Sequence, residues 1–179
     1  MQTIFDAIEE RQRFRAESTT REIFEIAGED IVVQRSQEDP ELQALLGNTI
    51  EAAMRTGMEA KRKLLARAAA AAFQNDERID PATLIVSALS QLEPVHIRAL
   101  ARLAKVEQGA AMKAVSDSEP VPVRAALIQT GVAIPSTMVF GGAVQIADVS
   151  EFGRHLLQEL REAAEEDNER LALDPQWGC

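Results

Sequence analysis

Few residues of this 179-residue chain have the types and spacing that chemistry requires. Nothing in the sequence places a carboxylate or a nucleophile beside either histidine, His96 or His155. The sequence contains no glycine-rich phosphate loop, no histidine pair at ligand spacing and no serine nucleophile elbow. We therefore predict no catalytic residue, no cofactor and no metal ligand, and we expect a protein that is not an enzyme. An active site assembled from distant positions stays an open alternative.

The clearest charged cluster is basic and lies between residues 55 and 67. It consists of Arg55, Lys61, Arg62, Lys63 and Arg67, and Glu59 is the one acid in this range. Lys63 and Arg67 share a helical face with Glu59, which favours pairing along the helix. We favour a solvated face for the other cations, with nucleic-acid contact as the alternative. The formal net charge of −10 disfavours nucleic acid as a partner.

Composition limits the class of protein further. The one cysteine, Cys179, is the last residue, so it cannot form a disulfide within the chain. No apolar run approaches the roughly 20 residues that a membrane span needs, and the first ten residues are acidic where a signal peptide is basic. We expect a soluble, cytoplasmic protein without a membrane partner.

The elements that position these residues are mostly helices. Residues 3 to about 27 are predicted to be helical, either as one long helix or as two helices broken near residues 18–20. The segment carries an apolar group near each end, Ile4, Phe5 and Ile8 in the first and Ile23 and Phe24 in the second. We predict that both groups contact partners, because the middle of the segment is polar.

Further helices begin where an acidic residue precedes a proline. Asp39-Pro40, Asp80-Pro81 and Glu93-Pro94 each combine an acidic residue with the residue that fits the first helical position. Five consecutive alanines at 68–72 predict a tightly packed central helix, because alanine favours helix and adds no bulk. The hydrophobic fraction is 46% and the aromatic fraction 4%, so small aliphatic side chains must build the core.

A β-hairpin is predicted near residue 141. Two β-leaning runs, 137–140 and 143–146, flank Gly141-Gly142, the two-residue glycine spacing of a hairpin turn. We expect Phe140 to anchor the hairpin near Phe152. Ser150 is predicted to cap the helix that follows.

From Glu93 onward, the order of predicted elements resembles that of winged-helix domains. Residues 93–103 look like their first core helix, 109–115 the second, 122–130 the reading helix and 136–149 the wing. Ser150-Glu-Phe-Gly153 looks like the helix start that often follows a wing in regulator families. The resemblance implies contact with DNA, but the reading helix offers only Arg124 and Gln129 for it. Many winged helices serve protein contacts instead.

We therefore predict a mainly α fold, a multi-helix bundle with a C-terminal winged-helix-like unit that carries one small β-hairpin. The expected organisation is a helical region over 1–92, the winged-helix-like region over 93–170 and a loose tail over 171–179, or one compact domain. The leading functional hypothesis is a non-enzymatic protein that self-associates and contacts an unidentified protein partner. The alternative is a dimeric DNA-binding regulator that uses the basic cluster and Arg124.

Overall fold

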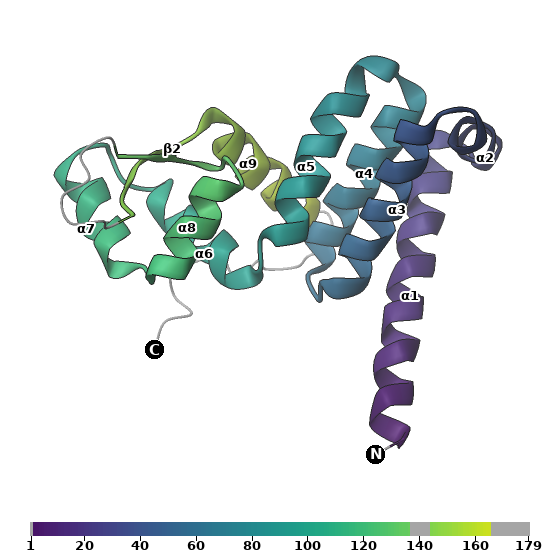
Figure 1. Cartoon of the computed structure of the whole chain (residues 1–179), viewed down its shortest axis with the longest axis horizontal. Coiled ribbons are helices and arrows are strands. Elements are labelled where there is room, and N and C mark those ends of the chain that lie inside the picture. Colours follow the sequence, from purple (N-terminus) through teal and green to yellow (C-terminus); the bar gives the residue numbers. More distant parts are fainter. Residues whose placement is uncertain (1, 137–143, 166–179) are drawn as a thin grey trace. The chain divides into compact units, whose positions relative to one another are not determined.

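The computed structural model describes residues 2–136 and 144–165, and over these ranges the fold is mainly α-helical with one small antiparallel strand pair (Figure 1). The chain divides into two compact units, Met1–Ser90 and Gln91–Cys179. The predicted tail at 171–179, with Cys179, lies outside the described residues. In chain order the elements are α1 (Gln2–Ala27), α2 (Glu29–Glu38), α3 (Pro40–Arg55), α4 (Glu59–Gln74), the 3-10 turn η1 (Asp76–Arg78), α5 (Ile79–Gln91), α6 (Pro94–Leu103), α7 (Ala110–Ser118), α8 (Val121–Gln129), β1 (Ala133–Pro135), β2 (Ile146–Val149) and α9 (Glu151–Glu165).

The first predicted helix is a single one, because α1 runs unbroken to Ala27. Gly28 ends it with a φ of 90°, a left-handed conformation that glycine adopts without steric cost. The Gly28 N–H still donates to the Phe24 carbonyl at 2.8 Å. The chain then turns directly into α2.

The helix starts predicted at Pro40 and Pro94 are confirmed. The Asp39 carboxylate caps α3 by accepting from the backbone N–H of Glu41 at 2.8 Å and from that of Leu42. Helix α6 begins at Pro94. Helix α5 begins at Ile79, two residues before the predicted Pro81, which therefore lies inside its first turn.

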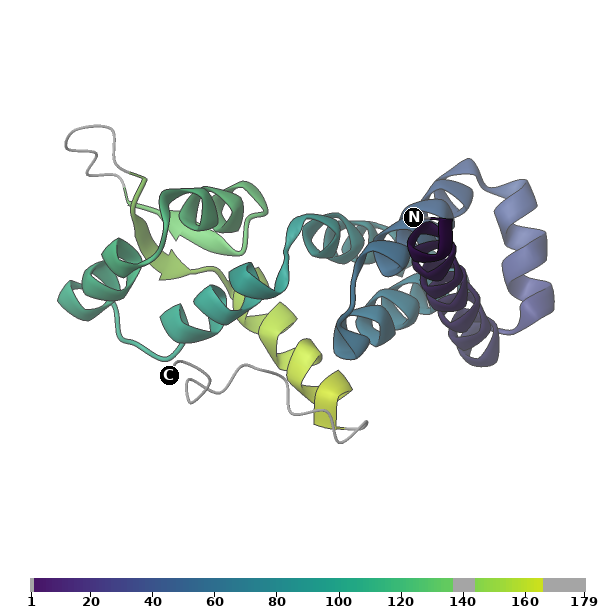
Figure 2. The ribbon, with the colours of Figure 1, turned by 90° about the horizontal axis from the view of Figure 1, so that it is seen from below.

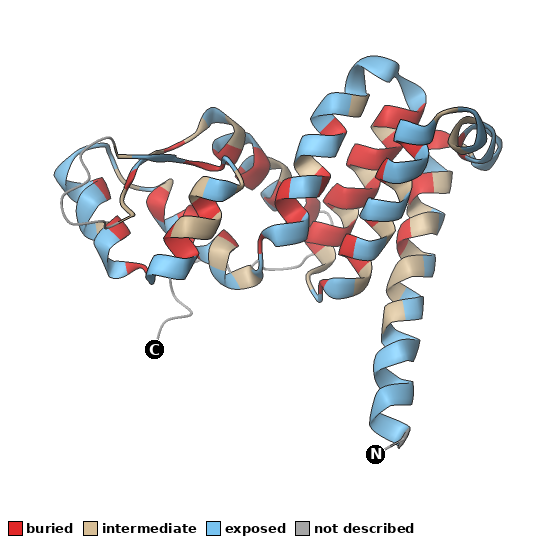
Figure 3. Ribbon diagram, viewed as in Figure 1, coloured by how far each residue is buried: buried red, intermediate tan, exposed pale blue. Residues whose placement is uncertain are grey.

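The core of the first unit is built around α4. Both α1 and α3 pack against this helix, and every residue from Leu64 to Phe73 is buried except Arg67 and Ala71, which are half-buried. Figure 3 shows buried residues along nearly the whole of α4. The alanine run thus lies in a tightly packed central helix, because alanine lets neighbouring backbones approach closely.

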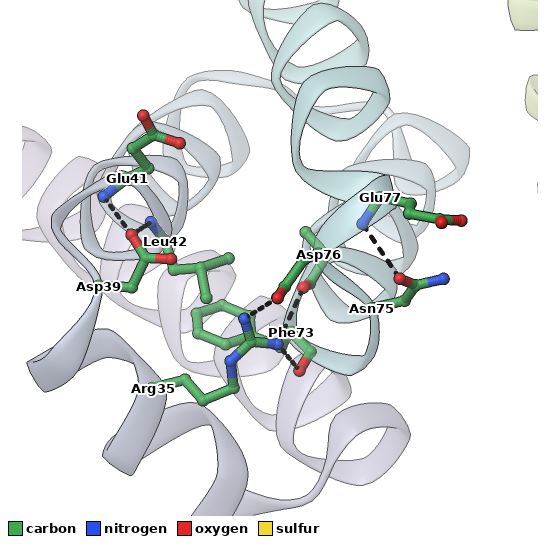
Figure 4. A network of polar contacts seen from close by, with 9 residues as sticks. Arg35, Asp39, Glu41, Leu42, Phe73, Asn75, Asp76 and Glu77 are labelled. Atoms are coloured by element: carbon green, nitrogen blue, oxygen red, sulfur yellow. Dashed lines mark hydrogen bonds and ion pairs between the residues drawn. The ribbon is translucent and has the colours of Figure 1, made fainter.

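The carboxyl end of α4 is closed by Arg35 from α2 (Figure 4). The Arg35 guanidinium donates to the Phe73 carbonyl at 2.7 Å and to the Ala72 carbonyl at 3.4 Å, and it also pairs with Asp76. Backbone carbonyls at a helix end have no partner within the helix. Arg35 supplies one, and its positive charge suits the negative end of the helix dipole.

In the second unit α6 contacts α7, α8 and α9, and the two strands lie beside α7 and α8. Ala133 pairs with Val149 and Ile134 with Asp148, and a bulge follows before Pro135 meets Ile146. The Ser136 N–H donates to the Gln145 carbonyl at 2.9 Å, which extends the pairing by one step. In Figures 1 and 2, β2 leads directly into α9.

The small antiparallel strand pair is present, and its described strands are Ala133–Pro135 and Ile146–Val149. The first predicted run, 137–140, lies outside the described residues, and of the second run only Ile146 belongs to β2 among its described residues. Phe140 and Gly141-Gly142, the predicted anchor and turn, lie outside the described residues. Strand β1 follows α8, and β2 leads into α9.

The predicted start of α9 is confirmed, and the structure explains its glycine. The Ser150 hydroxyl accepts from the Gly153 N–H at 3.0 Å and donates to the Gly131 carbonyl at 2.6 Å. The Ser150 N–H donates to the Val132 carbonyl at 3.0 Å. A Cβ at Gly153 would lie 2.1 Å from that carbonyl oxygen, so only glycine allows this close approach of helix and strand.

Candidate interaction surface

The carboxyl half of α1 packs against its own unit through one face. Thr19, Ile23 and Ala27 are buried, and α1 contacts α3 and α4. Their spacing of four residues keeps them on one side of the helix. Arg15 lies at the N-terminal edge of this contact, because its guanidinium donates to the Met54 carbonyl of α3 at 3.1 Å.

The same face continues beyond the bundle with larger apolar side chains. Phe5 precedes Ile23 by 18 residues, about five turns at 3.6 residues per turn, and therefore points the same way. Ile8 lies one turn further along this side and Ile4 flanks it. These side chains are 68%, 48% and 65% exposed for Phe5, Ile8 and Ile4. Every residue from 3 to 11 is exposed, and Figures 1 and 3 show this half of α1 extending past the other helices of its unit.

We call residues 3–13 of α1 the arm. A helical segment of this kind gains little stability from contacts with its own chain. Isolated helices shorter than about 12–15 residues are marginal in water, and most helix stability comes from packing an apolar face. Burying one side chain such as Phe or Ile contributes about 1.5–3 kcal/mol. The apolar residues Ile4, Phe5 and Ile8, which we call the arm face, therefore form the strongest candidate contact surface among the described residues.

The charges of the arm are segregated along its length. Asp6, Glu9 and Glu10 lie in its first half, and Arg11 and Arg13 follow. Arg13 makes an exposed ion pair with Glu17 at 3.9 Å, which leaves its guanidinium accessible. The arm thus has an acidic end and a basic end.

The second predicted apolar group, Ile23 and Phe24, packs within the first unit. Ile23 is fully buried in the core of the first unit, and Phe24 is half-buried. The prediction that Ile23 contacts a partner is therefore wrong. Sequence spacing could not separate the two groups, because both lie on the same helical stripe and only the length of α3 and α4 decides where the bundle stops.

The basic cluster is divided between core and surface. Lys61 is 2% exposed, Arg62 is buried and ion-paired with Glu59, and Lys63 and Arg67 are half-buried. Only Arg55 is exposed, and it pairs with Glu51. The expectation of a solvated basic face is thus incorrect for Lys61 and Arg62. These two buried cations are out of reach of a duplex backbone.

The candidate reading helix offers little to a nucleic acid. Arg124, the one cation of α8, is 7% exposed and lies 3.5 Å from an Asp117 oxygen. Val121, Pro122 and Gln129 are exposed on the same helix. The proposed DNA contact through Arg124 would need this side chain to leave its buried position.

Asp117 instead ties three elements of the second unit together. Its carboxylate accepts from Lys113 at 2.7 Å on α7 and from the Gln145 amide at 3.2 Å beside β2. Arg124 of α8 is its third partner. The hydrogen bond from Lys113 is the largest cause that lowers the pKa of Asp117 below its ordinary value. This carboxylate has a structural role.

Each histidine contacts a residue of its own helix or of that helix's N-cap. The His96 Nδ1 accepts from the Glu93 N–H at 2.9 Å and so closes the start of α6. His155 lies 3.8 Å from Glu159 on the exposed side of α9.

Within the described ranges, no group of three or more His, Cys, Asp or Glu residues could hold a metal ion. None of the helices described has the length and apolar character to cross a membrane.

Comparison of the chain with protein-family models, curated proteins and solved structures gives no match. The inference of function therefore depends on the residues themselves.

Proposed function

We propose that this protein is a non-enzymatic interaction protein and that it self-associates through the arm face of α1. The observation that carries the proposal is the continuation of one helical stripe from core to solvent. Ile23 and Thr19 are covered by α3 and α4, whereas Phe5 and Ile8 on the same side are covered by nothing in the described part of the chain. A second copy of the arm would bury Phe5 and Ile8 in the same way as α3 and α4 bury Ile23.

The charge pattern supports a second copy in the antiparallel orientation. Two antiparallel arms that overlap near their middle set Asp6 of one copy against Arg11 and Arg13 of the other. A parallel pair would set like charges against each other and so be destabilised. Each exposed pair contributes little, about 0.2–1 kcal/mol, so the charges select orientation while the arm face supplies most of the stability.

We expect the association to be weak and to depend on concentration. An overlap of ten residues is about 15 Å long at 1.5 Å per residue. Such a contact is smaller than the roughly 1,600 Å² of a standard stable interface. The arm is therefore suited to reversible pairing or to joining a larger assembly with a protein partner.

Sedimentation velocity of the full chain tests this proposal directly. The wild type should shift from monomer to dimer between about 1 μM and 1 mM. The double variant Phe5→Glu/Ile8→Glu should stay monomeric across that range. Phe14→Glu is the matched control, because Phe14 is 66% exposed but lies on the opposite face of the helix. It follows Phe5 by nine residues, which is about two and a half turns. This variant should associate like the wild type. A wild type that remains monomeric would sink the proposal.

Charge exchange tests the orientation and the identity of the partner. A chain with Arg11→Glu and Arg13→Glu has an all-acidic arm, and one with Asp6→Lys, Glu9→Lys and Glu10→Lys is largely basic. Each alone should self-associate less than the wild type, because like charges then face each other. An equimolar mixture should recover association at low salt and lose it at high salt. Equal association of all three samples would show that the arms do not pair.

DNA binding by the second unit is the second candidate, and the observation in its favour is the order of its elements. Three helices, two paired strands and a further helix follow one another as in winged-helix domains. A binder of this kind loses affinity steeply with salt because counterions are released. If no duplex binding is measurable at about 50 mM salt, where phosphate contacts are strong, this candidate is removed.

A further inference from the structure

The second unit contains a hollow lined by cations, separate from the arm and from α8. It has a volume of about 460 Å³ and is bordered by Ala104 and Lys105, just after α6, and by Arg154, Leu157 and Arg161 of α9. The three residues of α9 are spaced by three and four positions, so they share one face of that helix. Two elements distant in sequence thus bring three positive charges around one hollow.

Two of these cations have no counter-ion among the described residues. Arg154 pairs with Asp148 at 2.7 Å. Lys105 and Arg161 make no ion pair or side-chain hydrogen bond within 2–136 and 144–165. The other cations of α7 and α8, Lys113 and Arg124, both face Asp117.

The end of α6 does not account for Lys105. A cation after a helix can serve to bind the last carbonyls, but these carbonyls already have backbone partners. The Ala104 N–H donates to the Leu100 carbonyl at 2.9 Å, and the Lys105 N–H donates to that of Arg102 at 3.2 Å. The Val106 N–H does the same for Leu103. The ammonium group of Lys105 is therefore available to a ligand.

We propose that this hollow is a binding site for a small organic or inorganic anion whose charge is carried by phosphate or carboxylate oxygens. Its volume lies in the range of about 300–1,000 Å³ that is usual for small-molecule sites. Lysine and arginine are the side chains that bind such oxygens, through charge-assisted hydrogen bonds. Leu157, which is buried and lines the hollow, offers an apolar contact for the body of the ligand.

The site would give an acidic protein a place where anions concentrate. The chain has 29 acidic and 19 basic residues, so a dissolved anion is repelled over most of its surface. A local excess of positive charge around one hollow offsets this repulsion at that place. The proposal is independent of self-association by the arm.

Calorimetric titration of the full chain with pyrophosphate and, separately, with citrate tests the site. These probes distinguish phosphate from carboxylate chemistry, and sodium chloride at matched ionic strength controls for screening. Saturable binding of at least one probe is expected. Lys105→Gln/Arg161→Gln should weaken it by roughly tenfold or more, because each charged hydrogen bond that is lost contributes to affinity.

Arg98→Gln is the matched control. Arg98 is an exposed cation of α6 with no ion pair among the described residues, and it does not line the hollow. This variant removes a charge from the same unit and should bind the probe within about twofold of the wild type. Absence of saturable binding by both probes would overturn the proposal. Equal weakening by Arg98→Gln and by the double variant would also overturn it, because net charge alone would then explain the effect.

Discussion

Helix α4 and the first half of α1, both in the first unit, differ in burial and in the size of their apolar side chains. Helix α4 is buried along most of its length, and its buried residues are chiefly alanine. The first half of α1 is exposed on all sides over residues 3–11, yet it carries Ile4, Phe5 and Ile8. The small side chains are inside and several of the largest apolar ones are outside, which is the reverse of the usual expectation.

The difference shows what each helix depends on. Helix α4 needs small residues because α1 and α3 pack against it, and its stability comes from close contact within the unit. Among the described residues nothing covers the arm, so its large apolar side chains contribute to stability only when another surface buries them. Exposed apolar groups that continue a buried stripe are therefore a stronger sign of a partner than scattered ones, which are common on all proteins.

The largest expected contrast is between two phenylalanines. Phe73→Ala should lower the free energy of unfolding of the first unit by about 3–5 kcal/mol, because Phe73 is fully buried at the end of α4. Phe5→Ala should change it by less than about 0.5 kcal/mol at low protein concentration. Chemical denaturation followed by circular dichroism measures both. If Phe73→Ala does not fold, Phe73→Leu keeps the comparison, and a large loss from Phe5→Ala would show that the arm is packed in the monomer.

The next contrast uses the same substitution in both segments. Ala69→Leu should destabilise the first unit by about 1–3 kcal/mol, because Ala69 is fully buried and a larger side chain would overpack the core there. Ala7→Leu, on the exposed arm, should leave the unfolding midpoint nearly unchanged because leucine favours helix almost as well as alanine. Thermal unfolding of both variants in dilute solution provides the measurement. Similar destabilisation by the two changes would mean that α4 is not the tightly packed helix of the unit.

A smaller contrast concerns two arginines. Arg35→Ala should cost about 1–3 kcal/mol, because it leaves the Phe73 carbonyl at the end of α4 without this charged donor. Arg13→Ala removes only the exposed pair with Glu17 and should cost less than about 0.5 kcal/mol. Urea unfolding at low and high salt distinguishes the contributions of the two arginines, since salt screens the exposed Arg13–Glu17 pair more than the Arg35 contacts. Equal costs for both variants would contradict the role of Arg35 as a cap.

The smallest expected effect is a gain in stability within the buried half of α1. The Thr19 hydroxyl is buried without a hydrogen-bond partner, whereas the Thr20 hydroxyl donates to the Ala16 carbonyl at 2.9 Å. Thr19→Val should therefore raise the free energy of unfolding by about 1 kcal/mol, since it replaces an unsatisfied polar group with an apolar one of the same shape. Thr20→Val should bring no such gain. A loss of stability from Thr19→Val would indicate that its hydroxyl has a partner.

Much of the helical fold could be predicted from short stretches of sequence. Asp39-Pro40 and Glu93-Pro94 mark helix starts because capping and proline geometry act between neighbouring residues. Ser150 was recognised for the same reason. The register of β1 against β2 is not decided by neighbouring residues in this way, because its paired residues, such as Ala133 and Val149, are far apart in the sequence.

The sequence by itself determined the mainly α fold class, the large apolar residues of the arm and the small ones of α4, because residue types, helix propensity and periodicity can be read without knowing which residues are neighbours in space. Only the tertiary structure decided that Ile23 is covered while Phe5 is exposed, and that Lys61, Arg62 and Arg124 turn inward. It also brought Lys105 beside Arg154 and Arg161. The physical reason is that burial is a property of neighbours, and residues close in space here lie tens of positions apart in the chain.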